Sequence, residues 1–119
     1  MVKIDGFNFG FIVIDGKQYV NDVLILPDGN VLDRNPSMGR TGNHNISRNE
    51  IENLCKTEPE VVLLGCGTSW MVRLSESAEK YLQAINLNPI ILNSSSVADK
   101  YNQLTSEGKR VAALIHVTC

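Results

Sequence analysis

Three short apolar runs, separated by segments with helical periodicity, constrain the fold more than any other feature of this chain. They cover residues 61–64, 90–92 and 111–117. A continuous apolar run of this length is typical of a strand that is covered on both faces. Because a predicted helix joins the first two runs, we expect their strands to be parallel and the crossover between them to be right-handed. The pattern therefore predicts an α/β fold in which helices pack on a central sheet.

Capping patterns precede each of the helical segments. Ser47 and Glu50 form a capping box, in which each side chain accepts a hydrogen bond from an amide that the first helical turn leaves without a partner. Ser75 stands before a stripe of apolar residues that repeats at helical spacing. Ser96 and Asp99 show a similar spacing and predict the start of the last helix. We therefore expect three helices, one after each of these serines.

The first third of the chain has the pattern of antiparallel strands. Apolar residues dominate positions 9–14, and the pair Asp15-Gly16 follows them. This pair is a strong signal for a two-residue hairpin turn, because a type I′ turn needs positive φ at both positions. A second turn at residues 27–30 contains proline and glycine. We expect these turns to connect a three-strand meander that ends at Leu32.

Length and charge exclude several classes of protein. The 119 residues include 11 basic and 13 acidic side chains, a net charge of −2, with no basic stripe of the kind that dedicated nucleic-acid binders show. No apolar run approaches the ~18 residues of a membrane span, and the first residues lack the apolar stretch of a signal peptide. We expect one domain over residues 1–119, located in the cytoplasm, with free thiols at its cysteines.

The glycine turn after the first apolar run is the main candidate for ligand binding. It leaves the carboxyl end of a predicted central strand, where open α/β sheets bind their ligands. Two glycines allow backbone amides to approach an anion closely, and a helix that begins nearby favours negative charge. The alternative is that the glycines only permit a tight turn and close packing. The candidate residues are Gly65, Cys66, Gly67, Thr68, Ser69 and Arg73.

Nucleophilic catalysis and metal binding have weaker support. Ser69, Asp99 and His116 follow the chain order of a hydrolase triad, and Cys66 with His116 would be a thiolate pair. Against both, His116 belongs to the last apolar run, where a histidine is more often a hydrogen-bonded core group. We therefore assign no catalytic residue and predict that His116 is structural. No spacing among the possible metal ligands resembles a zinc motif: His44, Cys66, His116 and Cys119.

The segment from Asp33 to Asn45 contains hardly any apolar residue. It is about as long as structureless loops usually become in a compact domain, so it is either a mobile functional loop or a plain surface connection. Because it has few groups to bury, we expect it to be the most mobile internal segment. The arginines lie scattered in the sequence, and we expect a solvated position for them unless two converge on the glycine turn: Arg34, Arg40, Arg48 and Arg73.

Several short stretches are shared with one known family. They are Phe9-Gly10, Asp22-Val23, His44 before a capped helix, residues 59–67, Tyr101-Asn102 and the ending at residues 108–119. On these residues the chain resembles the Mth-type domain, long catalogued as a domain of unknown function, over its whole length. The ending is the most specific part of the resemblance and is most similar to prokaryotic and archaeal members.

The resemblance implies a layered α/β fold. It predicts a central mixed sheet of about five strands with helices packed on it, and a small β layer formed by the N-terminal meander. It also implies that the last strand runs antiparallel to its neighbours. The family has no established catalytic residues to assign to this chain. Its glycine turn usually has a small hydroxyl-bearing or similar residue between the glycines, so Cys66 departs from the pattern, which argues against a catalytic thiol.

Two classes of function stay open. The first is a non-enzymatic protein-interaction or assembly-factor-like module, because the resembled family includes a mitochondrial complex I assembly factor besides an adipogenesis-associated protein. Fold-level analogy of this kind is an associational argument. The second is a protein or enzyme that binds a small molecule or anion at residues 65–69. We expect a protein partner, no nucleic acid, no membrane span, no cofactor, and a monomer or weak homo-oligomer.

Overall fold

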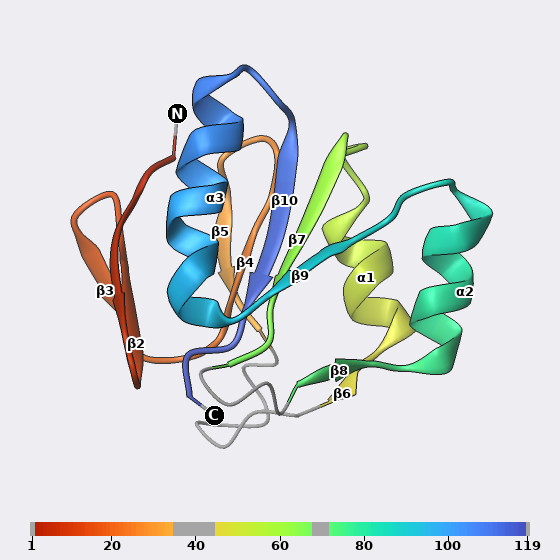
Figure 1. The fold of residues 1–119 in the computed structure, drawn as a ribbon, viewed down its shortest axis with the longest axis horizontal. Helices are drawn as coiled ribbons and strands as arrows, with labels where there is room; N and C mark the ends of the chain where they lie inside the picture. The colour runs from red at the N-terminus through yellow and green to blue at the C-terminus, as the bar shows by residue number, and fades with distance from the viewer. Residues whose placement is uncertain (1, 35–44, 68–71, 119) are drawn as a thin grey trace.

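A five-stranded mixed sheet lies at the centre of the computed structural model, which describes residues 2–34, 45–67 and 72–118 (Figure 1). Across the sheet the strand order is β5-β4-β10-β7-β9. The bounds of these strands are Val31–Asp33 for β5, Val23–Ile25 for β4, Val111–Ile115 for β10, Val61–Gly65 for β7 and Ile90–Leu92 for β9. The apolar runs of the sequence thus form the middle of the sheet and one of its edges.

Strand directions confirm one expectation and correct another. β7 pairs in parallel with both β9 and β10, so the parallel pairing predicted for the first two apolar runs is confirmed. β10 pairs antiparallel with β4, but the expectation that it runs antiparallel to its neighbours is wrong for β7. The helix after β9 returns the chain to the end of the sheet at which β7 begins. β10 therefore starts at that end and runs parallel to β7.

The N-terminal meander is shorter than predicted and begins earlier. It consists of β1 (Ile4–Asn8), β2 (Phe11–Ile14) and β3 (Lys17–Tyr19), which pair antiparallel. Asp15 and Gly16 have φ angles of 50° and 80°, so the predicted hairpin turn is confirmed. The expected continuation of the meander to Leu32 is wrong. The strand β4 is buried throughout and pairs with β10, so it and β5 belong to the central sheet instead.

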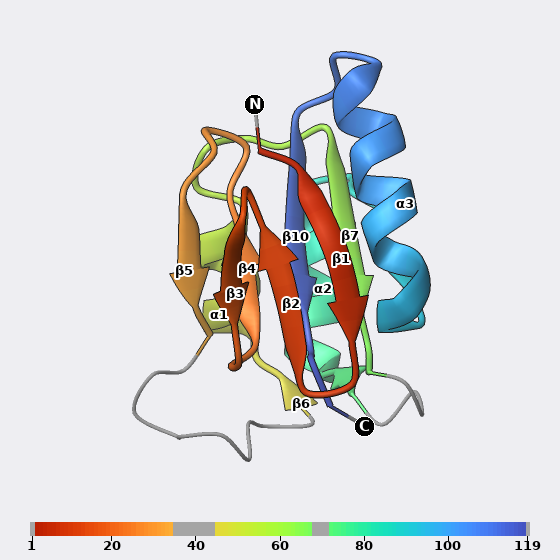
Figure 2. The ribbon, with the colours of Figure 1, turned by 90° about the vertical axis from the view of Figure 1, so that its left-hand side faces the viewer.

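Two layers cover the central sheet. The meander and α3 (Ser94–Ser106) pack on one face, and α1 (Arg48–Leu54) and α2 (Glu76–Ala84) pack on the other (Figures 1 and 2). Because successive side chains of a strand point to opposite faces, Ala113 and Ile115 of β10 join the first core cluster and Ala112 and Leu114 the second. All five residues of β10 are buried, which confirms that this run is covered on both faces.

The helix starts follow the predicted caps in two cases of three. The capping box of Ser47 and Glu50 is present, and the Ser75 hydroxyl accepts from the amide of Ala78. The last helix begins earlier than expected, because its N-cap is Asn93 and not Ser96. A short parallel pair of β6 (Asn45–Ile46) and β8 (Arg73–Leu74) lies beside the helices.

Two further expectations from the sequence concern the mobility of the segment 33–45 and the absence of a membrane span. Most of the segment from Asp33 to Asn45 lies outside the described residues, so its predicted mobility stays a prediction. Within the described ranges, no helix is long and apolar enough to cross a membrane.

Candidate functional site

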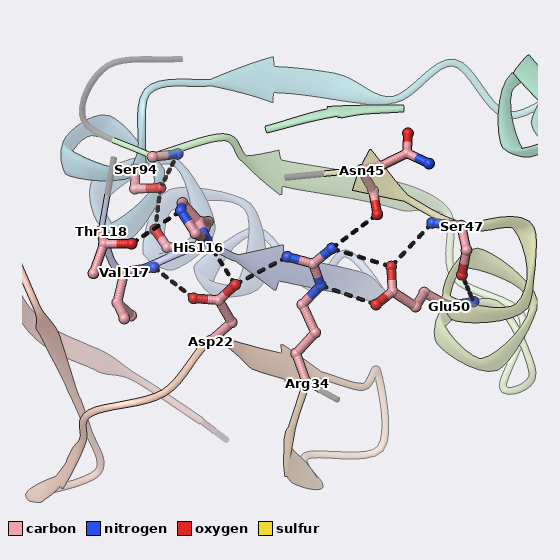
Figure 3. Close-up of polar contacts among 10 residues, drawn as sticks. Asp22, Arg34, Asn45, Ser47, Glu50, Ser94, His116, Val117 and Thr118 are labelled. Atoms are coloured by element: carbon pink, nitrogen blue, oxygen red, sulfur yellow. Dashed lines mark hydrogen bonds and ion pairs between the residues drawn. The ribbon is translucent and has the colours of Figure 1, made fainter. Parts of the chain in front are cut away.

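A buried network of charged side chains lies beyond the carboxyl end of β10, next to the glycine turn that follows β7 (Figure 3). Its centre is Arg34, which directly follows β5 and is only 3% exposed. Asp22, Glu50 and His116 surround it and are 7%, 9% and 0% exposed. Four titratable groups without access to water are costly unless they compensate one another, so their contacts decide what the site can do.

Arg34 binds two carboxylates. Its Nη1 donates to Oδ2 of Asp22 at 2.9 Å, and its Nε and Nη2 donate to the two oxygens of Glu50 at 3.0 and 3.2 Å. Nη2 also donates to the main-chain oxygen of Asn45 at 3.2 Å. This fork geometry is the one in which a guanidinium holds carboxylates most strongly. The expectation that Arg34 is solvated is therefore wrong.

His116 completes the network on the other side of Asp22. Its Nδ1 lies 2.6 Å from Oδ2 of Asp22, and its Nε2 lies 3.1 Å from the hydroxyl of Thr118. An ionised carboxylate only accepts hydrogen bonds, so Nδ1 carries the hydrogen of this pair. The amide of Val117 donates to the second oxygen of Asp22 at 3.0 Å. The prediction of a buried, hydrogen-bonded His116 is confirmed.

The hydroxyl of Ser94 connects the glycine turn with the carboxyl end of β10 by two hydrogen bonds. Its hydroxyl donates to the main-chain oxygen of His116 at 2.6 Å and accepts from the amide of Gly67 at 2.7 Å. A Cβ atom built on Gly65 would lie 3.0 Å from this hydroxyl oxygen, so a larger residue here would force Ser94 to shift. The amide of Cys66 donates to the main-chain oxygen of Leu92 at 2.9 Å. The amides of residues 66 and 67 are thus engaged within the protein.

The predicted ligand residues are only partly brought together. Cys66 and the exposed Arg73 line one cavity of about 300 Å³, together with Glu79. Gly65 ends β7 and is buried, whereas Thr68 and Ser69 lie outside the described residues. The anion site at residues 65–69 and Arg73 therefore stays a prediction.

The electrostatics of the site favour stable ion pairs over reactive groups. Burial by itself would raise the pKa of Asp22, but hydrogen bonds from His116, the Val117 amide and Arg34, with the attraction of His116, hold that pKa below its ordinary value. Burial raises the pKa of the Cys66 thiol, although Arg34 and Arg73 act in the opposite direction. A thiol with a raised pKa is a poor nucleophile at neutral pH.

The catalytic and metal arrangements weighed from the sequence find little support in this geometry. The carboxylate beside His116 is Asp22, whereas Asp99 is exposed on α3. Ser69, the nucleophile of the triad, lies outside the described residues, as do His44 and Cys119. Among the residues that the structure describes, no three His, Cys, Asp or Glu side chains are placed to hold a metal ion together.

Sequence reasoning missed Asp22 and Arg34, and it explained Glu50 only as half of a capping box. The capping role is real, because Oε2 of Glu50 accepts from the Ser47 amide at 3.0 Å while both carboxylate oxygens also bind Arg34. No local pattern marks this network, since the Asp22–His116 contact spans 94 positions in the chain. The one available signal was the place of Asp22 in the Asp22-Val23 stretch that carries the family resemblance.

A second feature, here called the α1–α2 groove, lies between two helices. It encloses about 630 Å³ and has an apolar floor with a charged rim at Glu52, Lys56 and Glu58. Ile85 at the end of α2 is 40% exposed although it is a large apolar residue. Arg48 packs over the ring of Tyr81, with 5.4 Å between the guanidinium carbon and the ring centroid. The apolar lining consists of Cys55, Pro59, Tyr81, Ile85 and Leu87.

Comparisons with known proteins agree with the fold and name no activity. A family model described as a protein of unknown function, DUF498/DUF598, matches residues 4–116. The chain is similar to the solved structure of a protein named MT938, with 26% identity, 100% of both chains covered and a TM-score of 0.82. It is also similar to the conserved hypothetical protein PH1505 from Pyrococcus horikoshii, with 28% identity, 98% of this chain and 99% of that chain covered, and a TM-score of 0.82.

A more distant similarity concerns the fold alone. The solution structure of a Bordetella pertussis protein, described as a Mth938-like domain, shares 18% identity with a TM-score of 0.72. The match covers 97% of this chain and 85% of that one. The predicted layered α/β fold, with its mixed five-stranded sheet and N-terminal meander, is confirmed.

Proposed function

Because this chain belongs to the DUF498/DUF598 family, whose function is unknown, its role has to be argued from its own surface, and we propose that it is a non-enzymatic protein-interaction module. The observation that carries this proposal is the α1–α2 groove, an apolar concavity bounded by charged residues. An apolar centre inside a polar rim is the usual anatomy of a protein-binding surface. An assembly-factor-like role is the form of this function that the sequence resemblance favours.

The shape of the groove suits an amphipathic helix of the partner. Two helices form its walls, and a third helix laid between them would bury the exposed face of Ile85 and the ring edge of Tyr81. Burial of large apolar and aromatic side chains supplies most of the binding energy in such interfaces. The rim residues Glu52, Lys56 and Glu58 would then determine the orientation of the bound helix.

The buried charged network supports a structural role for the region where the start of β4, the end of β10 and α1 meet. Arg34, Asp22 and His116 are buried and hydrogen-bond to one another, so these three side chains offer no exposed general acid or base. The cytoplasmic location expected from the sequence belongs to the same proposal. The free thiols of Cys55 and Cys66 fit a reducing compartment.

Anion or small-molecule binding at the glycine turn is the second candidate function. The observation that favours it is the cavity shared by Cys66 and Arg73, which lies directly after β7. The amide of Gly67 already donates to Ser94, so any anion there would depend mainly on Arg73 and on residues 68–69.

The interaction proposal is tested by affinity capture from the native host with three forms of the chain. Ile85→Glu places a charge in the groove, and Ile91→Glu is the matched control because Ile91 is a similarly exposed isoleucine, at 44%, that does not line the groove. We expect a protein that is retained by the wild type and by Ile91→Glu but lost with Ile85→Glu. Capture that is the same for all three forms would reject the groove as the binding surface.

A further inference from the structure

A third concavity, here called the Tyr101 cavity, lies at the end of the sheet where β10 begins. It encloses about 420 Å³. The turn between β4 and β5, the end of α3 and the N-terminal residues meet at this end of the molecule in both ribbon views (Figures 1 and 2). The buried network around His116 lies at the other end of β10, so the two sites share no residue. Neither the glycine turn nor the α1–α2 groove contributes to it.

Tyr101 is the most informative residue of this cavity. It is 3% exposed, and its ring belongs to the core cluster that also contains Val2 and Val111. Among the residues that the structure describes, its hydroxyl has no hydrogen-bond partner. The hydroxyl oxygen is not among the fully buried side-chain atoms without a partner, so it is open to the cavity that Tyr101 lines. A ligand in the cavity would therefore meet a hydroxyl group that makes no hydrogen bond to the described part of the protein.

Apart from the ammonium group of Lys109, the other polar side chains that line the cavity can accept hydrogen bonds. The hydroxyl of Thr105 donates to the main-chain oxygens of residues 101 and 102, at 3.0 and 3.2 Å, so toward a ligand it can only accept. Asp15 accepts one hydrogen bond from the amide of Lys3, and Asp28 accepts two from Asn30. A carboxylate has about four acceptor positions, so both retain capacity. These oxygens favour a ligand that donates hydrogen bonds.

Three backbone amides of this cavity are already used within the protein. The amide of Gly29 donates to the main-chain oxygen of Leu26 at 2.9 Å, and the amide of Gly108 donates to that of Thr105 at 3.0 Å. The amide of Lys109 donates to the oxygen of Leu104 at 3.1 Å. These three amides are therefore not free to converge on an anion in the way that anion-binding amides do.

The charge of the cavity favours a cation. Two carboxylates, Asp15 and Asp28, line it against the single ammonium group of Lys109. The carboxyl-terminal end of α3, with its partial negative charge, lies at the same place. Burial, and then repulsion by Asp15, raises the pKa of Tyr101 to about 12, so the phenol keeps its proton at neutral pH. The walls contributed by Val2, Pro27 and Val111 are apolar.

We propose that the Tyr101 cavity binds a small molecule that carries a primary ammonium group on an apolar body. The three N–H groups of the ammonium donate to the carboxylates of Asp15 and Asp28 and to the hydroxyl oxygen of Tyr101. The apolar body packs against Val2 and its neighbours. The volume lies within the range of about 300–1,000 Å³ that is usual for small-molecule sites. An amine and an amino acid share this ammonium chemistry, and the test separates them.

The test uses three probes that share one isobutyl group. Isopentylamine presents the ammonium group alone, 4-methylpentanoate presents a carboxylate alone, and leucine presents both. Each is titrated into the full ¹⁵N-labelled chain at constant pH and ionic strength, while the amides of Gly29, Gly108 and Lys109 are followed by NMR. We expect saturable shifts at these amides with isopentylamine and none with 4-methylpentanoate. Leucine that binds more tightly than isopentylamine identifies an amino acid as the ligand, and weaker leucine binding identifies a simple amine.

Variants of the cavity test the assigned contacts. Tyr101→Phe keeps the packed ring and removes only the hydroxyl, and we expect it to weaken isopentylamine binding roughly 3- to 10-fold. Asp15→Asn keeps a residue type that tolerates the positive φ of this position, and we expect a loss of roughly tenfold or more. Lys109→Gln removes a repelling charge and should strengthen amine binding.

Matched controls separate local effects from general ones. Tyr81→Phe removes a hydroxyl in the α1–α2 groove, and Asp99→Asn removes an exposed carboxylate of α3 that does not line the cavity. Both should bind isopentylamine as the wild type does. Equal shifts with isopentylamine and 4-methylpentanoate, or unchanged affinity in Tyr101→Phe and Asp15→Asn while both remain folded, would overturn the proposal.

Discussion

Asp22 and His116 are 94 positions apart in the chain, yet Oδ2 of the aspartate lies 2.6 Å from Nδ1 of the histidine. The aspartate precedes β4 and the histidine follows β10, and these two strands pair antiparallel. Antiparallel pairing brings the start of one strand beside the end of the other, so the contact follows from the topology of the sheet. Arg34 extends the contact to Glu50 on α1, which joins the sheet to the helical layer.

Removal of Asp22 should strongly destabilise the fold. In Asp22→Ala, Arg34 and His116 stay buried without their shared carboxylate, and breaking a buried ion pair in this way costs about 3–5 kcal/mol. Urea unfolding of the variant measures the loss. Asp33→Ala is the matched control, because Asp33 is an exposed aspartate next to Arg34, and we expect it to change stability by about 0.5 kcal/mol or less. Similar losses in the two variants would contradict a special role for the network.

The stability of the protein should fall on the acid side through Asp22. Its pKa is lowered in the folded state from an ordinary value of 3.8, so the unfolded chain binds the proton at a higher pH than the folded chain does. The stabilisation is therefore complete well above 3.8 and is lost as the pH falls below about 5 and through the folded pKa. Free energies of unfolding at a series of pH values measure this loss. The acid decline should be shallower in Asp22→Asn, and an unchanged decline would assign the effect to other carboxylates.

Gly65 should not tolerate even a methyl group. A Cβ atom at this position lies 3.0 Å from Oγ of Ser94 and 3.3 Å from a side-chain carbon of Ile115, where the core is already filled. Overpacking of this kind costs about 1–3 kcal/mol, so Gly65→Ala should lower the free energy of unfolding by that amount. Gly6→Ala is the control, since a Cβ there meets nothing within 4 Å. Equal stabilities of the two variants would show that Ser94 moves aside at little cost.

Phosphate should stabilise the wild type and Arg73→Ala to the same extent. The amides of Cys66 and Gly67 already donate within the protein, which leaves the exposed Arg73 as a single cation beside its cavity. A melting series in phosphate at matched ionic strength checks this expectation, because specific binding would raise the Tm of the wild type further. A clearly smaller shift in Arg73→Ala would favour the anion-binding alternative at the glycine turn.

Short-range patterns in the sequence determined most of the secondary structure. The capping box at Ser47, the cap at Ser75 and the hairpin turn at Asp15-Gly16 each depend on residues a few positions apart. The apolar runs likewise identified β7 and β10, because a strand covered on both faces needs apolar side chains at nearly every position. The run of β9 also forms a strand, but the expectation of cover on both faces is wrong there, because β9 lies at the edge of the sheet and Ile91 is 44% exposed. The cap of the last helix was placed wrongly, since Asn93 and Ser96 are equally good caps by local chemistry.

Tertiary structure alone decided the sites. The partners of Arg34 come from three separate segments, and the acceptors around Tyr101 come from two separate turns and from α3. Whether a charged or polar side chain is solvated or buried depends on which distant segment packs against it, and this is fixed by the strand order of the sheet. The sequence determined which elements form because those interactions are local. The network and the cavities depend on contacts between residues far apart in the chain, and these exist only once the layers have packed.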